Sequence, residues 1–143
     1  MTATILVVDD ERDMQQLLKR SLEPAFDCIV ETASSGESAL QMLTKGRFDL
    51  VLADIKMPGM DGLEVLSAIK ARNPDIQVIL LTGHATLQQG IEAMKLGAMD
   101  FIEKPADIQV LTEKIKQAQS QKMILVEKRL EKKIKRIIQE KAW

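Results

Sequence analysis

The fold of this chain is decided by the stretch Asp49-Leu50-Val51-Leu52-Ala53, which runs into Asp54-Ile55-Lys56-Met57-Pro58-Gly59-Met60-Asp61-Gly62. Its apolar part predicts a strand that is buried on both faces, as the central strands of parallel sheets are. Asp54 then lies at the carboxyl end of that strand, where open α/β sheets bind their ligands. The Pro and Gly residues that follow predict a turn before the next helix.

Strand-like and helix-like segments alternate five times along the chain. The strand-like runs are residues 4–8, 27–32, 49–53, 76–81 and 99–103. Helical connections between parallel strands are right-handed, which limits the topologies available. We therefore expect an α/β fold with a doubly wound five-stranded parallel sheet, in the flavodoxin-like order 2-1-3-4-5.

Polar pairs spaced three residues apart predict the beginnings of three helices. These pairs are Ser34 with Glu37, Asp61 with Glu64, and Thr86 with Gln89. Apolar residues at helical spacing predict the faces of the first and fourth helices. These faces comprise Met14, Leu17, Leu18 and Leu22, and Leu87, Ile91 and Met94.

Length and composition exclude several classes of protein. The chain has 143 residues, which is room for one domain and a short extension, and its net charge of −1 favours neither a nucleic-acid nor a membrane partner. No apolar run is long enough for a transmembrane helix, and no signal peptide is visible. The single cysteine, Cys28, excludes an internal disulfide, so we expect a cytoplasmic protein.

A cluster of acidic residues is expected at the carboxyl edge of the sheet. Asp9 and Asp10 end the first apolar run, so they converge with Asp54 if the two strands are neighbours. Three carboxylates repel one another unless a hard cation lies between them, and Mg²⁺ is the cation expected at such a site. A carboxylate beside Mg²⁺ can act as a nucleophile toward phosphorus, with Lys104 supplying positive charge and the Thr82 hydroxyl a donor.

Taken together, these residues make the chain resemble the receiver domain of bacterial two-component response regulators. The features that carry the resemblance are Asp9-Asp10, Asp54 with its Met57-to-Gly62 tail, Thr82-Gly83 and Lys104-Pro105, over residues 4 to about 120. The stretch Thr82-Gly83-His84-Ala85 is most similar to receivers of the enhancer-binding activator group.

The resemblance implies a phosphoacceptor signalling domain, which catalyses only its own phosphorylation and dephosphorylation and is not otherwise an enzyme. Asp54 would take a phosphoryl group from a sensor histidine kinase or a phosphotransfer protein. The required Mg²⁺ would be bound by Asp10 and Asp54, by Asp9 largely through water, and by the backbone carbonyl of Lys56.

The resemblance also implies roles for Thr82, Phe101 and the Lys104-Pro105 bond. Thr82 and Phe101 would form the switch that responds to phosphorylation; a static core position is the alternative for Phe101. His84 is either a solvent-facing loop residue or one that tunes water access. The Lys104-Pro105 bond is a candidate for the cis geometry.

The carboxyl-terminal segment departs from a minimal receiver. We expect a receiver domain at residues 1–121 and a basic amphipathic extension at 122–143, within one helix from about 108 to about 141. The extension holds eight Lys or Arg and three Glu. Its apolar stripe predicts a coiled-coil homodimer, with a downstream protein partner for output. The stripe comprises Met123, Val126, Leu130, Ile134 and Ile137.

Several alternatives stay open at this point. The basic residues of the extension could bind DNA, the extension could fold back or fray, or it could be a linker to an output domain. Those basic residues are Lys128, Arg129, Lys132, Lys133, Lys135 and Arg136. A haloacid-dehalogenase-like phosphatase also uses an Asp nucleophile with Mg²⁺, but it needs a second Asp where this chain has Lys56.

Overall fold

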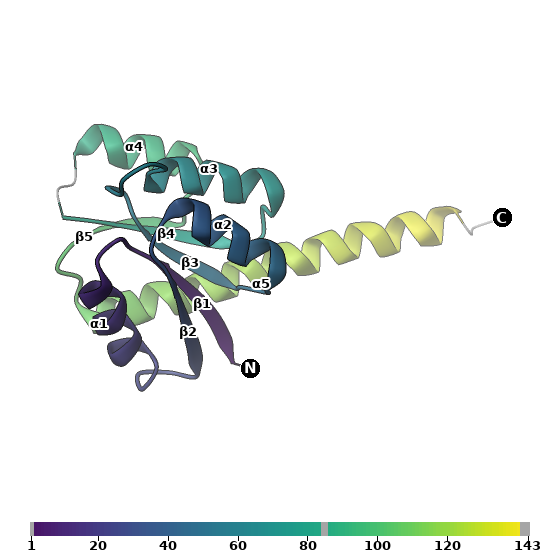
Figure 1. Cartoon of the computed structure of the whole chain (residues 1–143). Helices are drawn as coiled ribbons and strands as arrows, with labels where there is room; N and C mark the ends of the chain where they lie inside the picture. Colours follow the sequence, from purple (N-terminus) through teal and green to yellow (C-terminus); the bar gives the residue numbers. More distant parts are fainter. Residues whose placement is uncertain (1, 84–85, 141–143) are drawn as a thin grey trace.

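The computed structural model describes residues 2–83 and 86–140, and its centre is a parallel sheet covered by helices on both faces (Figure 1). The strands are β1 (Ala3–Val8), β2 (Cys28–Ala33), β3 (Leu50–Asp54), β4 (Gln77–Thr82) and β5 (Asp100–Glu103). The helices are α1 (Arg12–Leu22), α2 (Gly36–Lys45), α3 (Gly62–Arg72), α4 (Leu87–Lys95) and α5 (Ile108–Glu140). The strand order β2-β1-β3-β4-β5 confirms the predicted topology. His84 and the last three residues lie outside the described part of the chain.

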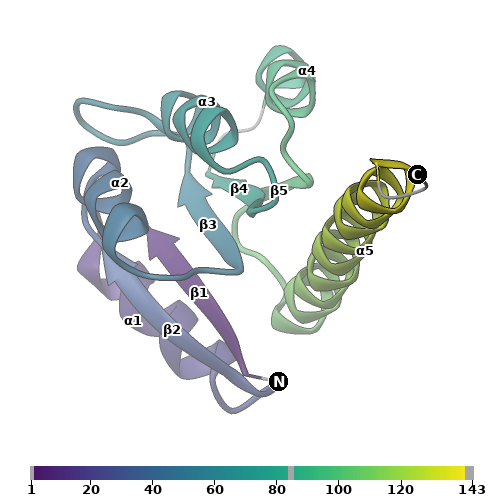
Figure 2. The same ribbon diagram turned by 90° about the vertical axis from the view of Figure 1, so that its right-hand side faces the viewer.

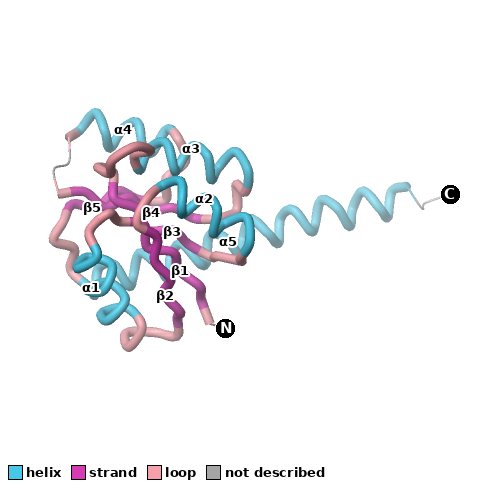
Figure 3. Tube along the Cα trace, in the orientation of Figure 1, coloured by secondary structure: helices cyan, strands magenta, loops and turns pink. Residues whose placement is uncertain are grey.

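Each face of the sheet has its own hydrophobic core because side chains alternate along a strand. Leu6 and Val8 of β1 point into the core beneath α2, α3 and α4, whereas Ile5 and Val7 point into the core beneath α1 and α5. Figures 2 and 3 show these two helical layers on opposite sides of the strands. β3 is buried along its whole length, which places Asp54 at the end of a rigid element.

The predicted helix caps are confirmed at two of the three positions. Asp61 and Glu64 form the full capping box of α3, and the Thr86 side chain accepts the Gln89 N–H at the start of α4. The prediction for α2 was wrong by one residue, because the N-cap is Ser35, whose side chain accepts the Ser38 N–H.

The two predicted apolar faces differ in what they pack against. In α1, Leu18 and Leu22 are buried, whereas Leu17 is exposed. In α4 the predicted face points outward, and the Leu87 side chain is 82% exposed. Ala93 is instead the residue of α4 that is buried against the sheet, because a small side chain lets the helix approach closely.

α5 continues as one helix of 33 residues, about 50 Å long, well past the edge of the sheet (Figure 1). Leu111, Ile115 and Ala118 pack its first third against the sheet. Beyond them nearly every side chain is exposed. Among the described residues, no helix combines the length and the hydropathy that crossing a membrane requires.

Candidate functional site

The three predicted acidic residues meet at the carboxyl edge of the sheet. Asp54 is the last residue of β3, and Asp9 and Asp10 directly follow β1, its neighbour in the sheet. One carboxylate oxygen from each lies within 4.8 Å of the other two. Asp9 and Asp54 are buried, at 2% and 7% exposure, whereas Asp10 is exposed.

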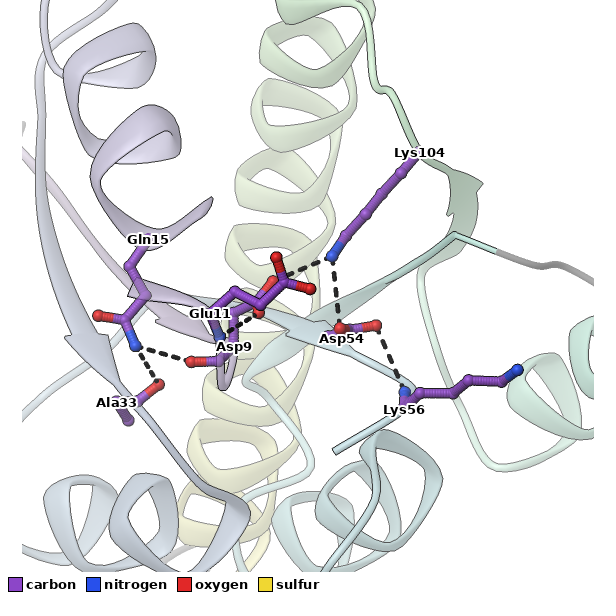
Figure 4. Close-up of polar contacts among 7 residues, drawn as sticks. All are labelled: Asp9, Glu11, Gln15, Ala33, Asp54, Lys56 and Lys104. Carbon is purple, nitrogen blue, oxygen red and sulfur yellow. Dashed lines mark hydrogen bonds and ion pairs between the residues drawn. The ribbon is translucent and has the colours of Figure 1, made fainter. Parts of the chain in front are cut away.

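Lys104 joins two of these carboxylates. It follows β5, and its ammonium donates to Asp9 Oδ2 at 3.0 Å and to Asp54 Oδ2 at 3.3 Å (Figure 4). Burial alone would lower the pKa of Lys104, but its bond to Asp9 and the charges of both carboxylates raise it above the ordinary value. Lys104 therefore stays charged at neutral pH.

The surroundings of Asp54 disfavour the charged form of its carboxylate. Burial is the largest influence on its pKa and raises it; Lys104 opposes the shift, and the nearby Asp9 adds to it. Its Oδ1 accepts the backbone N–H of Lys56 at 3.3 Å, and Figure 4 shows the Lys56 side chain directed away from the carboxylates. Three carboxylates and one ammonium leave two formal negative charges, which matches a divalent cation.

A buried glutamine supports the end of β1. The Gln15 amide on α1 donates to Asp9 O at 2.7 Å, to Ala33 O at 3.4 Å and to Ser34 Oγ at 3.1 Å. It therefore ties β1 to β2 just where the acidic pair begins (Figure 4). The Asp9 side chain is also held, because its Oδ1 accepts the Glu11 N–H at 2.9 Å.

The loop after Asp54 is held by close contacts. Gly62 begins α3 against the backbone of β3, and a Cβ there would lie 2.4 Å from Asp54 O. Gly59 has a φ of +76°, which favours glycine. Glu37 of α2 accepts the Met60 N–H at 3.2 Å and so holds the far side of the loop.

The two predicted switch residues come from neighbouring strands. Thr82 ends β4 and is fully buried, and its carbonyl accepts the Lys104 N–H at 2.7 Å. Phe101 in β5 is half-buried, contacts the core beneath α4 and lines a groove between α4 and β5. The Lys104-Pro105 bond is cis, as predicted.

Comparison with known proteins agrees with this geometry. The family described as "Response regulator receiver domain" matches residues 5–116. The chain belongs to this family.

The similarity extends to curated proteins and to solved structures. The receiver is 35% identical to the C4-dicarboxylate transport transcriptional regulatory protein DctD of Rhizobium meliloti (strain 1021), over 88% of this chain and 27% of that protein. It is 42% identical to the DNA-binding transcriptional regulator NtrC of Klebsiella pneumoniae, over 71% of this chain and 22% of that protein. These relatives confirm the resemblance to enhancer-binding activators.

A crystal structure of a response regulator receiver domain protein from Clostridium thermocellum has a TM-score of 0.81 and 40% identity, covering 86% of this chain and 98% of that one. The chain spans about a quarter of the length of the curated relatives reported above.

Sequence patterns predicted the acidic residues and Lys104 but not the residues that support them. Gln15 had a detectable signal, because it lies on the same helical face as the buried Leu18 and Leu22, where a polar side chain needs a partner. The bond from Glu37 to the loop had no local signal, since 23 residues separate it from Met60.

Proposed function

We propose that this receiver accepts a phosphoryl group on Asp54 from a sensor histidine kinase or a phosphotransfer protein, in a reaction that requires Mg²⁺. The observation that carries the proposal is the convergence of Asp9, Asp10 and Asp54 around one point, with Lys104 beside them. An oxygen of Asp54 would form the new bond to phosphorus, and the bond from phosphorus to the donor nitrogen would break.

Each side chain has a distinct task in this proposal. Asp10 and Asp54 would hold the cation directly, Asp9 would hold it largely through water, and Lys56 would contribute its backbone carbonyl. The cation would offset negative charge on the phosphoryl oxygens. Lys104 already reaches Asp54 and would supply a further positive charge to those oxygens.

The test compares Asp54→Asn with Asp13→Asn, which changes an exposed aspartate in the first turn of α1. Each protein is incubated with acetyl phosphate, with and without EDTA, and its intact mass is measured. We expect a phosphate adduct on wild type and on Asp13→Asn only when Mg²⁺ is present, and none on Asp54→Asn. An adduct on Asp54→Asn, or one that forms equally well in EDTA, contradicts the proposal.

The proposed response to phosphorylation is a change in packing at Thr82 and Phe101. The Thr82 hydroxyl would move toward the phosphoryl oxygens, and Phe101 would rotate into the space it leaves. The half-buried position of Phe101 beside the α4–β5 groove supports this proposal, because it gives the ring two environments. Thr82→Ala should then accept phosphoryl without the change in NMR shifts around Phe101 that wild type shows on adding beryllofluoride.

The proposed output is a homodimer that contacts a downstream protein. The extension supports pairing, because its apolar stripe is exposed in one chain, with Leu130 and Ile134 at 52% and 55%. A parallel coiled coil would cover that stripe and leave the basic residues at the surface. DNA binding by those residues is the alternative, and a gel shift on nonspecific DNA in a salt series distinguishes the two.

The proposed compartment is the cytoplasm. The buried Cys28 thiol, which forms no disulfide, is compatible with it.

A further inference from the structure

The first two turns of the extension are attached to the domain by two ion pairs. Lys122 donates to Asp49 Oδ1 at 2.8 Å. Arg129 contacts both carboxylate oxygens of Asp75, with Nη2 at 2.7 Å from Oδ1 and Nη1 bonded to Oδ2. Both aspartates precede strands, so they lie at the amino edge of the sheet, where α5 leaves the domain (Figure 1).

The helical register explains why these two basic residues reach the domain. Ile115 and Ala118 pack on the sheet, and Lys122 follows four residues later on the same face. Arg129 comes seven residues, or about two turns, after Lys122. The face that docks is therefore apolar over the sheet and becomes basic where it passes the acidic edge.

The backbone around Asp75 is held by the domain independently of the helix. The Lys70 ammonium donates to Pro74 O at 3.2 Å and to Ile76 O at 2.7 Å, so the backbone on both sides of Asp75 is fixed. The Gln77 amide donates to Asp75 O at 3.3 Å. The Asp75 side chain is only 13% exposed and presents both oxygens to the guanidinium, which is the favoured bidentate arrangement.

Asp49 is held in a similar way. Its Oδ2 accepts the backbone N–H of Thr4 at 2.9 Å, which leaves Oδ1 for Lys122. Burial acts to raise the pKa of Asp49, but the bonds from Lys122 and Thr4 lower it below the ordinary value. Its carboxylate is therefore charged at neutral pH and already oriented toward the helix.

We propose that Asp49 and Asp75 form an acidic socket that receives Lys122 and Arg129, holding the start of the extension helical and in one orientation. Most of the stability of a helix in a protein comes from tertiary packing rather than from the helix propensity of its residues. The socket would supply the missing contacts up to Arg129, so the apolar stripe leaves the domain already in the form that pairs. The socket itself does not depend on phosphorylation; its benefit to dimer formation rests on the proposed function.

The test is amide hydrogen exchange in a double-mutant cycle of Asp75→Asn and Arg129→Gln. All variants carry Leu130→Glu with Ile134→Glu, which prevents pairing, so that exchange reports the helix of a single chain. We expect each substitution at the socket to speed exchange of amides 119–130 by up to about fivefold. The double variant should exchange no faster than either single variant, because both remove the same contact.

Lys132→Gln is the matched control, since it removes one positive charge from the same helix at an exposed position outside the socket. It should leave exchange of amides 119–130 unchanged. Arg129 is 60% exposed, so Arg129→Gln cannot prevent the domain from folding even if Asp75→Asn does. Exchange equal to the parent in Arg129→Gln, additive effects in the double variant, or the same acceleration in Lys132→Gln would overturn the proposal. Intact-mass phosphorylation of Asp54 is measured separately, so failure of the socket and failure of the phosphoacceptor assignment are distinguishable.

Discussion

Replacing Gly62 by alanine should destabilise the receiver through a clash with the backbone that carries Asp54. The added Cβ would lie 2.4 Å from Asp54 O and 2.8 Å from Ile55 Cα. The first distance is 1.0 Å shorter than the 3.4 Å at which ordinary contact begins. Neither neighbour can rotate away, because both belong to the main chain at the end of β3 and directly after it.

The cost follows from what must move. Relief requires α3 to shift away from β3, which weakens the bond from the Gly62 N–H to Ile55 O, now 2.9 Å long. Overpacking costs about 1–3 kcal/mol, and the hydrogen bond contributes about 1 kcal/mol. We therefore expect a loss of about 2–4 kcal/mol in the free energy of unfolding, with slower phosphorylation of Asp54 as its backbone is displaced.

The measurement is urea unfolding followed by circular dichroism, with Gly83→Ala as the control. Gly83 also lies beside the site, but a Cβ there has no neighbour within 4 Å. Its replacement should change the free energy of unfolding by no more than about 0.5 kcal/mol. If Gly62→Ala proves as stable as Gly83→Ala, the close approach of α3 to β3 does not constrain the site.

Three further outcomes are expected. Leu130→Glu with Ile134→Glu removes four half-exposed apolar side chains per dimer, worth about 1 kcal/mol each, so sedimentation equilibrium should show self-association weakened about a thousandfold, and Lys132→Glu should not. In EDTA at pH 7, Asp54→Asn should unfold at a higher urea concentration than wild type, because its free energy of unfolding is greater by about 0.5–2 kcal/mol. Burial raises the pKa of Asp54 above 3.8, so the folded state is destabilised by the charged carboxylate at neutral pH but not by the protonated form at low pH. The extra stability of Asp54→Asn over wild type should therefore shrink as pH falls through the raised pKa. Mg²⁺ at a hundred times its Kd should add about 2.7 kcal/mol to the free energy of unfolding of wild type, seen as a higher melting temperature. The increase should be smaller in Asp10→Asn.

Local patterns were sufficient for much of the fold and the acidic site. Alternation of strands and helices, together with the handedness of parallel connections, predicted a doubly wound parallel sheet. The flavodoxin-like strand order expected for such a sheet placed Asp9, Asp10 and Asp54 together. The misses came from features that local patterns do not contain. Ser34 and Ser35 are equivalent as residue types, and only the backbone at the start of α2 selects Ser35 as the cap.

The orientation of α4 needed the tertiary structure for a different reason. Leu87 is a strongly apolar residue at helical spacing, yet it is exposed, because the face of α4 with the small Ala93 fits closest to the sheet. Hydrophobic periodicity shows that a helix has two faces, but the shape of the neighbouring surface decides which of them is buried.

The sequence by itself determined which residues end the strands, and hence that Asp54 would meet Asp9 and Asp10 at one edge. Only the tertiary structure decided that Lys104 lies between Asp9 and Asp54, and that Arg129 docks on Asp75 at the opposite edge. Strand ends follow from short-range patterns of apolar residues. An ion pair between residues separated by 54 positions, such as Asp75 and Arg129, forms only when the packed core has brought two distant segments within reach of each other.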